Sequence, residues 1–294
     1  MRNAFIDELV ALAGQHRQIA LIVGDLGFSV IEPFADRFPD RFINAGVAEQ
    51  NMTGLAAGMA SEGYHVFTYS IANFPTFRCA EQIRNDIDYQ KLPVTVVAVG
   101  GGLAYGALGY SHHAVQDYAL IRSMPNMLIA APGDPSEVRA CLRYLVAHPQ
   151  PSYLRLGKTG ERDFHAGIPE LAPGRWHPVA APGPTSKHVL LSTGATLELA
   201  MTLQQRPEYR EHAVCSLPLW GLGSKPLQPA QIAGVDSVTT LEDHLEDGGF
   251  GSWLMESLKH EPDLRARLHG LSLDADVCGL VGSQATLNAL GGLR

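Results

Sequence analysis

Short apolar runs and longer helical patterns alternate along the first half of the chain. The runs have the length of strands and occupy residues 19–23, 65–69, 94–99, 127–131 and 153–156. Continuous apolar runs of this length are typical of strands that are buried on both faces of a parallel sheet. Strands and helices that alternate at this spacing predict a doubly wound α/β domain, in which helices cover both faces of the sheet.

The helical segments between these runs carry their own start signals. Asp134 and Pro135 suit the N-cap and the first turn of a helix, and Glu137 completes a start that resembles a capping box. Apolar residues then follow at helical spacing as far as residue 146. A second helix is expected at 48–61, where glycines and alanines are small enough to let another backbone approach closely.

The alternation lapses in the middle of the chain and then resumes. Residues 161–186 contain five prolines and no sustained periodicity, which is typical of a linker. Beyond them we expect strands at 189–192, 238–241 and 273–280, and helices at 196–204, 249–258 and 283–290. The sequence therefore predicts two doubly wound parallel-sheet domains, 1–160 and 187–294, joined by a linker at 161–186.

Composition and charge argue against some classes of binding partner. The chain has 294 residues, with 30 Asp and Glu against 22 Lys and Arg, and its formal net charge is −8. A chain of this length buries about three quarters of its unfolded surface, so it needs no disulfide or metal to hold its core. The acidic balance and the absence of basic clusters in the sequence argue against nucleic acid or an anionic membrane as the main partner.

The cysteines and the N-terminus indicate a compartment. The four cysteines are far apart and show no zinc-type spacing. Asp7 and Glu8 stand where a signal peptide would be apolar, and no run approaches the ~20 apolar residues of a membrane span. We therefore expect a reduced, cytoplasmic protein without a membrane partner.

One carboxylate stands out by its surroundings. Glu49 opens the helix expected at 48–61 and has Val47 and Met52 as neighbours in sequence. It could simply complement the helix dipole, which is worth about 0.3–1 kcal/mol. It could also be partly desolvated, which raises the proton affinity of a carboxylate and suits acid–base chemistry. The residue types alone leave both interpretations open.

The same stretch carries a resemblance to a known family. The segments RFINAGVAEQNMTGLAAGMASEG, ANFPTFRCAEQIRND, GGGLAYGALGYSHHAVQDYALIRSMPNM and APGDPSEVRACLRYLVAHPQPSYLRLGK resemble the pyrimidine-binding domain of transketolases. LLSTGATLELA and VTTLEDHLEDGGFGS resemble the C-terminal domain of that family. The Gly-Asp-Gly…Asn signature of the amino-terminal half, which binds diphosphate and magnesium, does not occur in the sequence. The chain thus resembles the carboxy-terminal subunit of a split transketolase.

This resemblance implies thiamine diphosphate as the cofactor and assigns residues to it. Glu49 matches the glutamate that bonds ring nitrogen N1′ of the aminopyrimidine, so that the exocyclic nitrogen can take the thiazolium proton. Val47 matches the apolar residue that keeps the cofactor bent, and Phe74 matches the ring that stacks on the pyrimidine. Ordinary core packing would also explain the apolar residues. The other residues that we assign to the cofactor site are Phe77, Ile71 and Asp25, the last because open α/β sheets bind ligands at strand ends.

The resemblance also implies a substrate site. His112 matches a catalytic histidine that bonds sugar hydroxyls, and His113 is its neighbour. Ser29, Lys158 and Arg2 match groups that bind the phosphate of a sugar, although they could equally be ordinary surface groups. None of the residues that we assign is a metal ligand, since the Mg²⁺ ligands are expected on a partner subunit.

Two positions depart from the family pattern. Many transketolases carry Gly-Glu-Asp-Gly before the substrate histidine, whereas this chain has residues 106–109 as Gly-Ala-Leu-Gly, with Leu108 in place of the aspartate. The phosphate-binding histidine that usually begins this loop is replaced by Gly100. The expected cofactor residues are intact and some substrate residues are altered, which favours a modified or differently phosphorylated sugar.

The resemblance implies a subunit that transfers a two-carbon ketol unit from a ketose to an aldehyde, in an α2β2 assembly with an amino-terminal partner. Two alternatives remain open. One is the beta chain of a 2-oxo-acid dehydrogenase or another thiamine-dependent decarboxylase, although residues 78–86 and 111–113 are closer to transketolases. The other is a non-catalytic protein that has kept the fold, against which the intact Glu49 and Phe74 argue.

Overall fold

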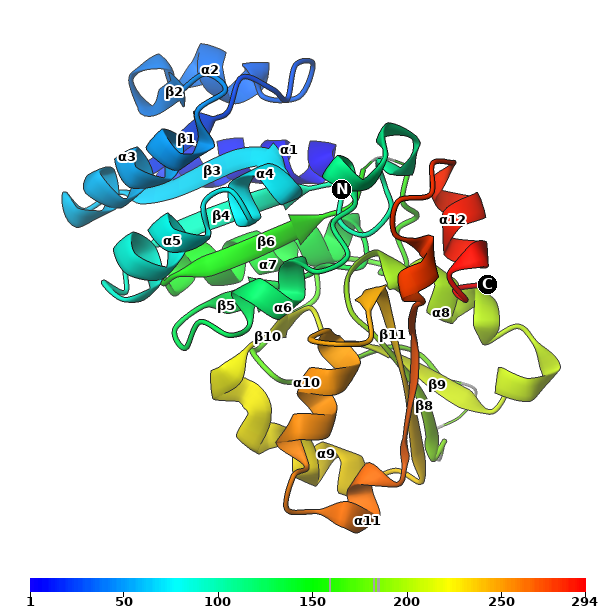
Figure 1. Ribbon diagram of the computed structural model, residues 1–294. Coiled ribbons are helices and arrows are strands. Elements are labelled where there is room, and N and C mark those ends of the chain that lie inside the picture. The colour runs from blue at the N-terminus through cyan, green and yellow to red at the C-terminus, as the bar shows by residue number, and fades with distance from the viewer. Residues whose placement is uncertain (159, 182, 184–185) are drawn as a thin grey trace.

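A seven-stranded sheet organises the first half of the chain in the computed structural model, which describes residues 1–158, 160–181, 183 and 186–294 (Figure 1). In spatial order its strands are β10 (Leu219–Trp220), β5 (Leu128–Ala130), β6 (Ser152–Leu156), β4 (Val94–Val99), β3 (His65–Ile71), β1 (Ile19–Val23) and β2 (Phe42–Asn44). All neighbours in this sheet are parallel except β10, which runs antiparallel to β5.

Helices cover both faces of this sheet. One face carries α1 (Arg2–Gln15), α2 (Glu32–Arg37) and α7 (Pro135–Ala147), and the other carries α3 (Glu49–Ser61), α4 (Asn73–Thr76), α5 (Ala80–Gln82), a π-helical turn at Ile83–Asp88 and α6 (Asp117–Ile121). Successive strand residues point to opposite faces, so Leu21 packs in the same cluster as Phe5 of α1, whereas Ile22 packs with Met52 of α3. This arrangement confirms the predicted doubly wound architecture.

Two of these helices begin and end close to the positions that the sequence predicted. The Asp134 carboxylate caps α7 by accepting a hydrogen bond from the Glu137 amide at 2.8 Å, and Pro135 is the first helical residue. Helix α3 begins one residue later than the predicted range and ends at Ser61. Gly63 follows in the left-handed region at φ 94°, where a side chain would be strained.

A five-stranded sheet organises the second half. Its spatial order is β12 (Leu268–Leu273), β11 (Ser237–Leu245), β8 (His188–Ser192), β9 (His212–Ser216) and β7 (His177–Ala180). All neighbours are parallel except β7, which is antiparallel to β9. The helices of this half are α8 (Leu197–Leu203), α9 (Gln228–Ala233), α10 (Phe250–Ser257), α11 (Pro262–Arg265) and α12 (Gln284–Leu290). Both sheets are thus mixed rather than purely parallel.

Some expected elements differ from those observed. The strand expected at 273–280 is wrong, because β12 ends at Leu273 and Asp274 then caps a 3-10 turn by accepting a hydrogen bond from the Asp276 amide at 2.9 Å. The range 161–186, expected as a linker, contains β7; its residues 182, 184 and 185 lie outside the described part of the chain. Strands β2, β9 and β10 were not expected from the pattern.

The two halves share a hydrophobic core. Trp220 of β10 is buried, and its ring lies 5.1 Å from those of Tyr118 and Trp253 and 5.3 Å from that of Phe250. A strand from the second half therefore completes the first sheet and carries an aromatic contact between the two halves.

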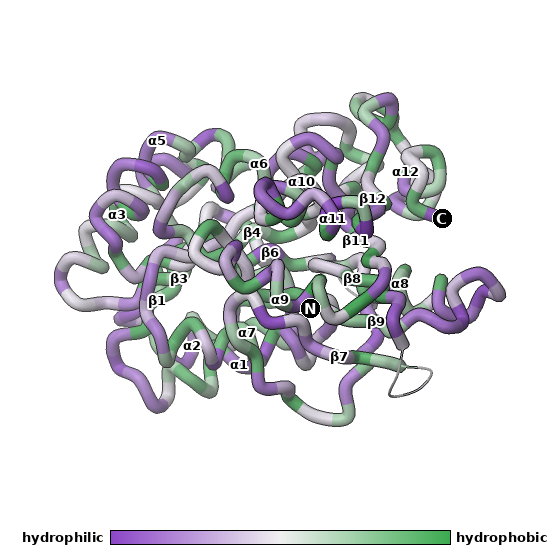
Figure 2. The backbone as a smooth tube through the Cα atoms, turned by 90° about the horizontal axis from the view of Figure 1, so that it is seen from below, coloured by the Kyte–Doolittle hydropathy of each residue, from purple (hydrophilic) through white to green (hydrophobic). Residues whose placement is uncertain are grey.

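Hydropathy follows the same layering. Hydrophilic stretches lie on the outer turns near α5 and on the segment that follows α8, whereas β1 and β4 are buried along their whole length (Figure 2). Within residues 1–158, 160–181, 183 and 186–294, every helix is too short or too polar to cross a membrane.

Candidate functional site

The assigned residues gather at the carboxyl edge of the first sheet. Strands β1, β2, β3, β4 and β6 are parallel and all end at this edge. The chain moves to one side of β1 to form β2 and to the other side to form β3, so the order reverses at β1. Open α/β sheets bind ligands outside the strand ends at such a reversal.

Glu49 is a buried carboxylate at this edge. It is the first residue of α3 and is 1% exposed. Arg78 Nη1 donates to its Oε2 at 2.6 Å, which offsets part of the cost of burying the charge. Its Oε1 accepts no hydrogen bond from the residues that the structure describes. One carboxylate oxygen therefore remains free to bond a ligand.

A continuous line of side chains runs from this carboxylate across the strand ends. Arg78 Cζ lies 4.9 Å from the centre of the Phe74 ring, and the His112 ring meets Phe74 edge-on at 5.2 Å. The Tyr105 ring lies 6.4 Å from that of His112, and Lys158 Nζ lies 5.1 Å from the centre of Tyr105. The structure thus brings together Phe74, His112 and Lys158, which the sequence predicted separately.

The remaining predicted substrate residues have different surroundings. Arg2 Nε donates to the Lys158 carbonyl at 2.9 Å, which places Arg2 at the end of the same line. His113 is buried, and its Nε2 lies 3.4 Å from the Gly106 carbonyl oxygen. Asn73 Nδ2 donates to the His113 carbonyl at 2.8 Å. This bond links the segment that carries His112 and His113 to α4. His113 therefore contributes more to the shape of the loop than His112 does.

The apolar residues flank an open cavity of about 660 Å³. Phe74, Phe77, Tyr110 and His113 are among the residues that line this cavity. Phe77 is half-exposed and lines the cavity, Ile71 is the last residue of β3, and Val47 is 74% exposed in the loop before α3. An exposed valine and an exposed phenylalanine next to a buried carboxylate indicate an apolar surface that a ligand or another chain can cover.

The loop after β1 holds Asp25 and Ser29 in an unusual backbone conformation. Their φ angles are 54° and 66°, a region that costs a non-glycine residue of order 1–3 kcal/mol. The side-chain amide of Asn44 donates to Asp25 Oδ1 at 3.0 Å, and the backbone amide of Ser29 donates to Glu32 Oε1 at 2.7 Å. The latter bond also lowers the pKa of Glu32. Strain of this kind clusters at binding sites, and the loop adjoins Glu49 through Gly24.

The structure explains one departure from the family pattern. Gly100 has a φ of 81°, and a Cβ atom at this position would overlap the Tyr105 ring. Tyr105 therefore takes the space into which a side chain at position 100 would project. Leu108, at the other departure, is exposed.

Arg78 and Tyr105 were missed as site residues in the sequence. Arg78 follows Phe74 by four residues, the spacing of neighbours on one helical face, and this signal could have found it. Tyr105 carries no such signal, because its place depends on how the loop folds back over Gly100.

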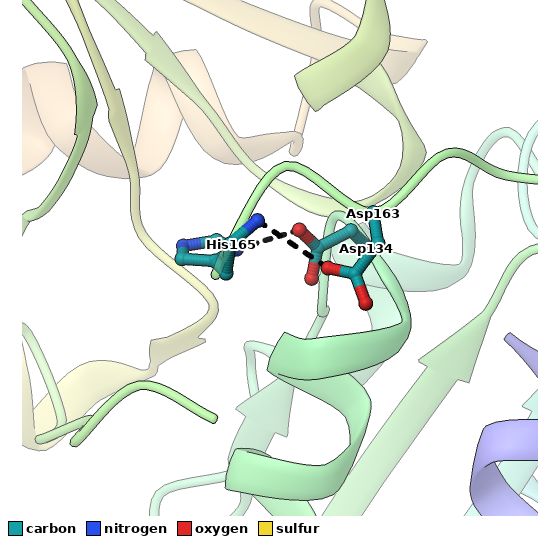
Figure 3. A group of neighbouring side chains, drawn as sticks. All are labelled: Asp134, Asp163 and His165. Carbon is teal, nitrogen blue, oxygen red and sulfur yellow. Dashed lines mark hydrogen bonds and ion pairs between the residues drawn. The ribbon is translucent and has the colours of Figure 1, made fainter. Parts of the chain in front are cut away.

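A separate group of side chains lies at the start of α7 (Figure 3). Asp134, Asp163 and His165 offer polar atoms within 4.8 Å of one another, the only such group with potential metal ligands among the described residues. His165 Nδ1 bonds Asp134 Oδ2 at 2.6 Å, and Ser136 Oγ donates to Asp163 Oδ2 at 2.9 Å. These bonds tie residues 163–165 to helix α7.

Glu137, which lies near this group, is expected to make the stability of the protein depend on pH. It is fully buried and accepts hydrogen bonds from the Gly133 amide and the Ser216 hydroxyl, and burial raises its pKa from 4.5 to about 7. A raised pKa means that the folded state favours the protonated form, so this contribution to stability is lost as pH rises from about 4.5 to 7. Glu137→Gln is expected to flatten that part of the profile.

The measurement is the free energy of unfolding in urea at several pH values between about 4.5 and 7.5. Glu62→Gln, at an exposed position just after α3, is the control and should keep the wild-type slope. Equal slopes for wild type and Glu137→Gln would show that this carboxyl group does not titrate in the folded protein.

Known proteins resemble the chain over most of its length. A subunit of the apulose-4-phosphate transketolase of Phocaeicola vulgatus is 32% identical over 267 residues, covering 89% of this chain and 84% of that protein. A protein of Methanocaldococcus jannaschii described as a transketolase C-terminal section is also 32% identical, covering 87% of this chain and 81% of that protein. A 1-deoxy-D-xylulose-5-phosphate synthase of Clostridium perfringens is 29% identical over 264 residues, covering 87% of this chain and 41% of that protein.

Solved structures agree with these relatives. A split-gene transketolase described as an inactive beta4 tetramer superposes with a TM-score of 0.84 at 29% identity, covering 100% of this chain and 93% of that chain. Transketolase from Leishmania mexicana has a TM-score of 0.80 at 19% identity and covers 100% of this chain and 43% of that chain, which shows a shared fold. The family model "Transketolase, pyrimidine binding domain" matches residues 1–161. The chain therefore belongs to the thiamine-dependent transketolase family, as a subunit that contains its pyrimidine-binding domain.

Proposed function

We propose that this chain is the carboxy-terminal subunit of a split transketolase that transfers a two-carbon ketol unit from a ketose to an aldehyde. The observation that carries the proposal is Glu49, a buried carboxylate with one free oxygen. Its partner Arg78 lies over the Phe74 ring and lines the open cavity. Ordinary core packing does not require a buried acid at this place, because burying a charge costs free energy and the pair with Arg78 offsets only part of that cost. The retained acid therefore favours a catalytic role over a non-catalytic protein with the same fold.

The residues at the sheet edge fit one half of thiamine diphosphate. Glu49 Oε1 can bond the N1′ atom of the aminopyrimidine, and the half-buried Phe74 ring offers a flat apolar surface for stacking. When bound, this cofactor supplies the electron sink that cleavage of a ketose requires. Val47 would support the bent shape of the cofactor, and Phe77, Ile71 and Asp25 would surround its pyrimidine. The diphosphate and Mg²⁺ ligands are assigned to an amino-terminal partner.

In this proposal the chain contributes proton handling and orientation. Glu49 would hold a proton at N1′ and so make the exocyclic nitrogen basic, while Arg78 keeps the carboxylate in place through its bond to Oε2. His112 stands over Phe74 and can bond a sugar hydroxyl with its ring nitrogens, one of which lies 3.0 Å from the Ser111 hydroxyl oxygen. The partner subunit would cover the open cavity that Phe77 lines and so exclude water from the reaction.

The positive charges of Arg2 and Lys158 favour a phosphorylated substrate. The Arg2 side chain bonds the backbone carbonyl of Lys158, and Lys158 Nζ lies over the Tyr105 ring. The Phocaeicola relative is named for a sugar 4-phosphate, which supports the same class of substrate. Ser29 lies on the neighbouring loop and could add a hydroxyl to the phosphate site.

Lys158→Ala is expected to raise the KM for a phosphorylated ketose about tenfold with a smaller change in kcat, because it removes a charge that contacts the phosphate. The measurement is steady-state kinetics of the assembled enzyme with a phosphorylated and an unphosphorylated ketose. The control is Lys259→Ala, which changes an exposed lysine in the second half. An equal rise in KM for both ketoses would contradict a phosphate contact.

The assembly is tested by expressing the chain with and without an amino-terminal transketolase subunit. The mixture should form an α2β2 complex that binds thiamine diphosphate and transfers ketol units, whereas the chain alone should do neither. The inactive beta4 tetramer of the related split-gene transketolase supports this expectation. Ketol transfer by this chain alone would overturn the split-subunit proposal.

A second thiamine chemistry is tested in the same preparation. The alternative is decarboxylation of a 2-oxo acid, as in the beta chain of a 2-oxo-acid dehydrogenase or another thiamine-dependent decarboxylase. Release of carbon dioxide from pyruvate by the complex, without cleavage of any ketose, would replace ketol transfer by this alternative.

A further inference from the structure

Residues 100–116 connect β4 to α6 and carry His112; we call them the His112 loop. The loop contains only two short 3-10 turns, Gly106–Leu108 and Tyr110–His112. Such turns are too short to hold a loop in one conformation, so its position depends on contacts with the rest of the chain. These contacts come from Arg155 of β6 and from the second half of the molecule.

The start of the loop rests on a buried ion pair between the two halves. Arg155 of β6 donates from Nη1 to Oδ1 of Asp243 on β11 at 2.5 Å. A Cβ atom at Gly101 would come within 2.7 Å of Arg155 Nη1, and one at Gly102 would overlap Asp243 Oδ2. The glycines therefore let the backbone lie directly against the ion pair.

The end of the loop is held by the same arginine. Arg155 Nη2 donates to the Ala114 carbonyl at 2.8 Å, and Ala114 exchanges two backbone hydrogen bonds of 2.9 Å with Gly102. Arg155 Nε donates to Asp117 Oδ2 at 2.7 Å, one residue after the loop. The backbone amide of Leu245, at the end of β11, donates to the Val115 carbonyl at 3.0 Å.

The middle of the loop contacts the last helix. A Cβ atom at Gly106 would lie 2.5 Å from Leu287 of α12, and the Gly282 amide donates to the Gly106 carbonyl at 3.3 Å. Leu103 packs in one buried cluster with Leu287. In Figure 1, α12 stands beside this loop at the edge of the first sheet.

These contacts give the second half a part in substrate binding. We propose that Arg155 and Asp243 are positioning residues, through which β11 fixes the His112 loop and so sets the affinity for the sugar. The inference rests on the proposed function of His112. Arg155 is shared between Asp117 and Asp243, and all three side chains are buried, so a change at Asp243 reaches both ends of the loop.

The first test measures the loop itself by hydrogen–deuterium exchange in the full chain. Asp243→Asn keeps the shape of the side chain but removes its charge, and exchange of the amides at 103–113 is expected to rise about tenfold. Glu256→Gln is the matched control, because it breaks another ion pair between the halves, Arg122 to Glu256 at 2.8 Å, away from the loop. Equal exchange in the loop for wild type and Asp243→Asn would overturn the proposal, as would the same rise in the control.

Leu287→Ala provides a second variant should Asp243→Asn fail to fold. It leaves the ion pair intact and removes the contact at Gly106. Faster exchange confined to the middle of the loop is expected. Unchanged exchange there would show that α12 does not hold the loop.

The second test separates positioning from general damage. In the assembled complex, Asp243→Asn is expected to raise the KM for the ketose about tenfold, with kcat and the affinity for thiamine diphosphate within about twofold of wild type. A looser loop with an unchanged KM would overturn the role in substrate binding. A wild-type complex that transfers no ketol unit would instead refute the proposed function, and the substrate part of this inference with it.

Discussion

Replacing Glu49 by glutamine is expected to lower the kcat of the assembled enzyme at least ~10²-fold, the range of a lost acid–base group. Glutamine has nearly the same shape and can still accept a hydrogen bond from Arg78, so the packing at the start of α3 should survive. It cannot hold and release a proton, however, which is the role assigned to the free Oε1 atom. The loss should therefore appear in kcat rather than in the stability of the chain.

The experiment compares steady-state turnover and thermal unfolding of the two forms. Glu62→Gln, placed just after the end of the same helix and exposed, should leave turnover unchanged. Near-normal turnover of Glu49→Gln would remove Glu49 from the mechanism. A large fall in the unfolding midpoint would instead mean that its pair with Arg78 is mainly structural.

Trp220→Ala is expected to lower the free energy of unfolding by about 3–5 kcal/mol, the usual cost of deleting a large buried aromatic side chain. The ring is fully buried against Tyr118, Phe250 and Trp253, and its Nε1 donates to the Thr193 hydroxyl at 3.0 Å. Its loss leaves a cavity where the two halves meet, and neighbours from both sheets line that cavity.

Urea unfolding of the full chain, followed by tryptophan fluorescence and circular dichroism, measures this cost. Trp220→Phe keeps most of the ring and loses the bond to Thr193, so it should cost about 1 kcal/mol. A cost for Trp220→Ala no larger than that of Trp220→Phe would mean that the interface between the halves contributes little.

The fold could be predicted wherever one segment carried its own signal. Strand β4 is buried on both faces, and its apolar run matches the observed strand to the residue. Strands β2 and β10 have only three and two residues, and their pairing with β1 and β5 comes from the tertiary structure. No local pattern in such short segments separates a strand from a loop.

The candidate site, like the fold, could be predicted only where a single segment carried its own signal. Glu49 stood out as a carboxylate at the start of an apolar helix, but the residue types left two interpretations open and the family resemblance assigned its role. Its burial agrees with the desolvated interpretation. Its partner Arg78 lies on another element, and the space at Gly100 is filled by Tyr105 from within a loop. Both depend on contacts that the sequence pattern does not describe.

The antiparallel strand β10 also bears on how the protein is made. Strand β5 cannot pair on its outer side until residues 219–220 have been synthesised, more than eighty residues after β5 itself. During that interval the nascent first sheet presents an unpaired, apolar edge, the feature by which incomplete sheets associate wrongly. Two residues from the second half thus pair with the exposed edge of β5. A chain released from the ribosome before these residues are synthesised would keep that edge unpaired and prone to aggregation.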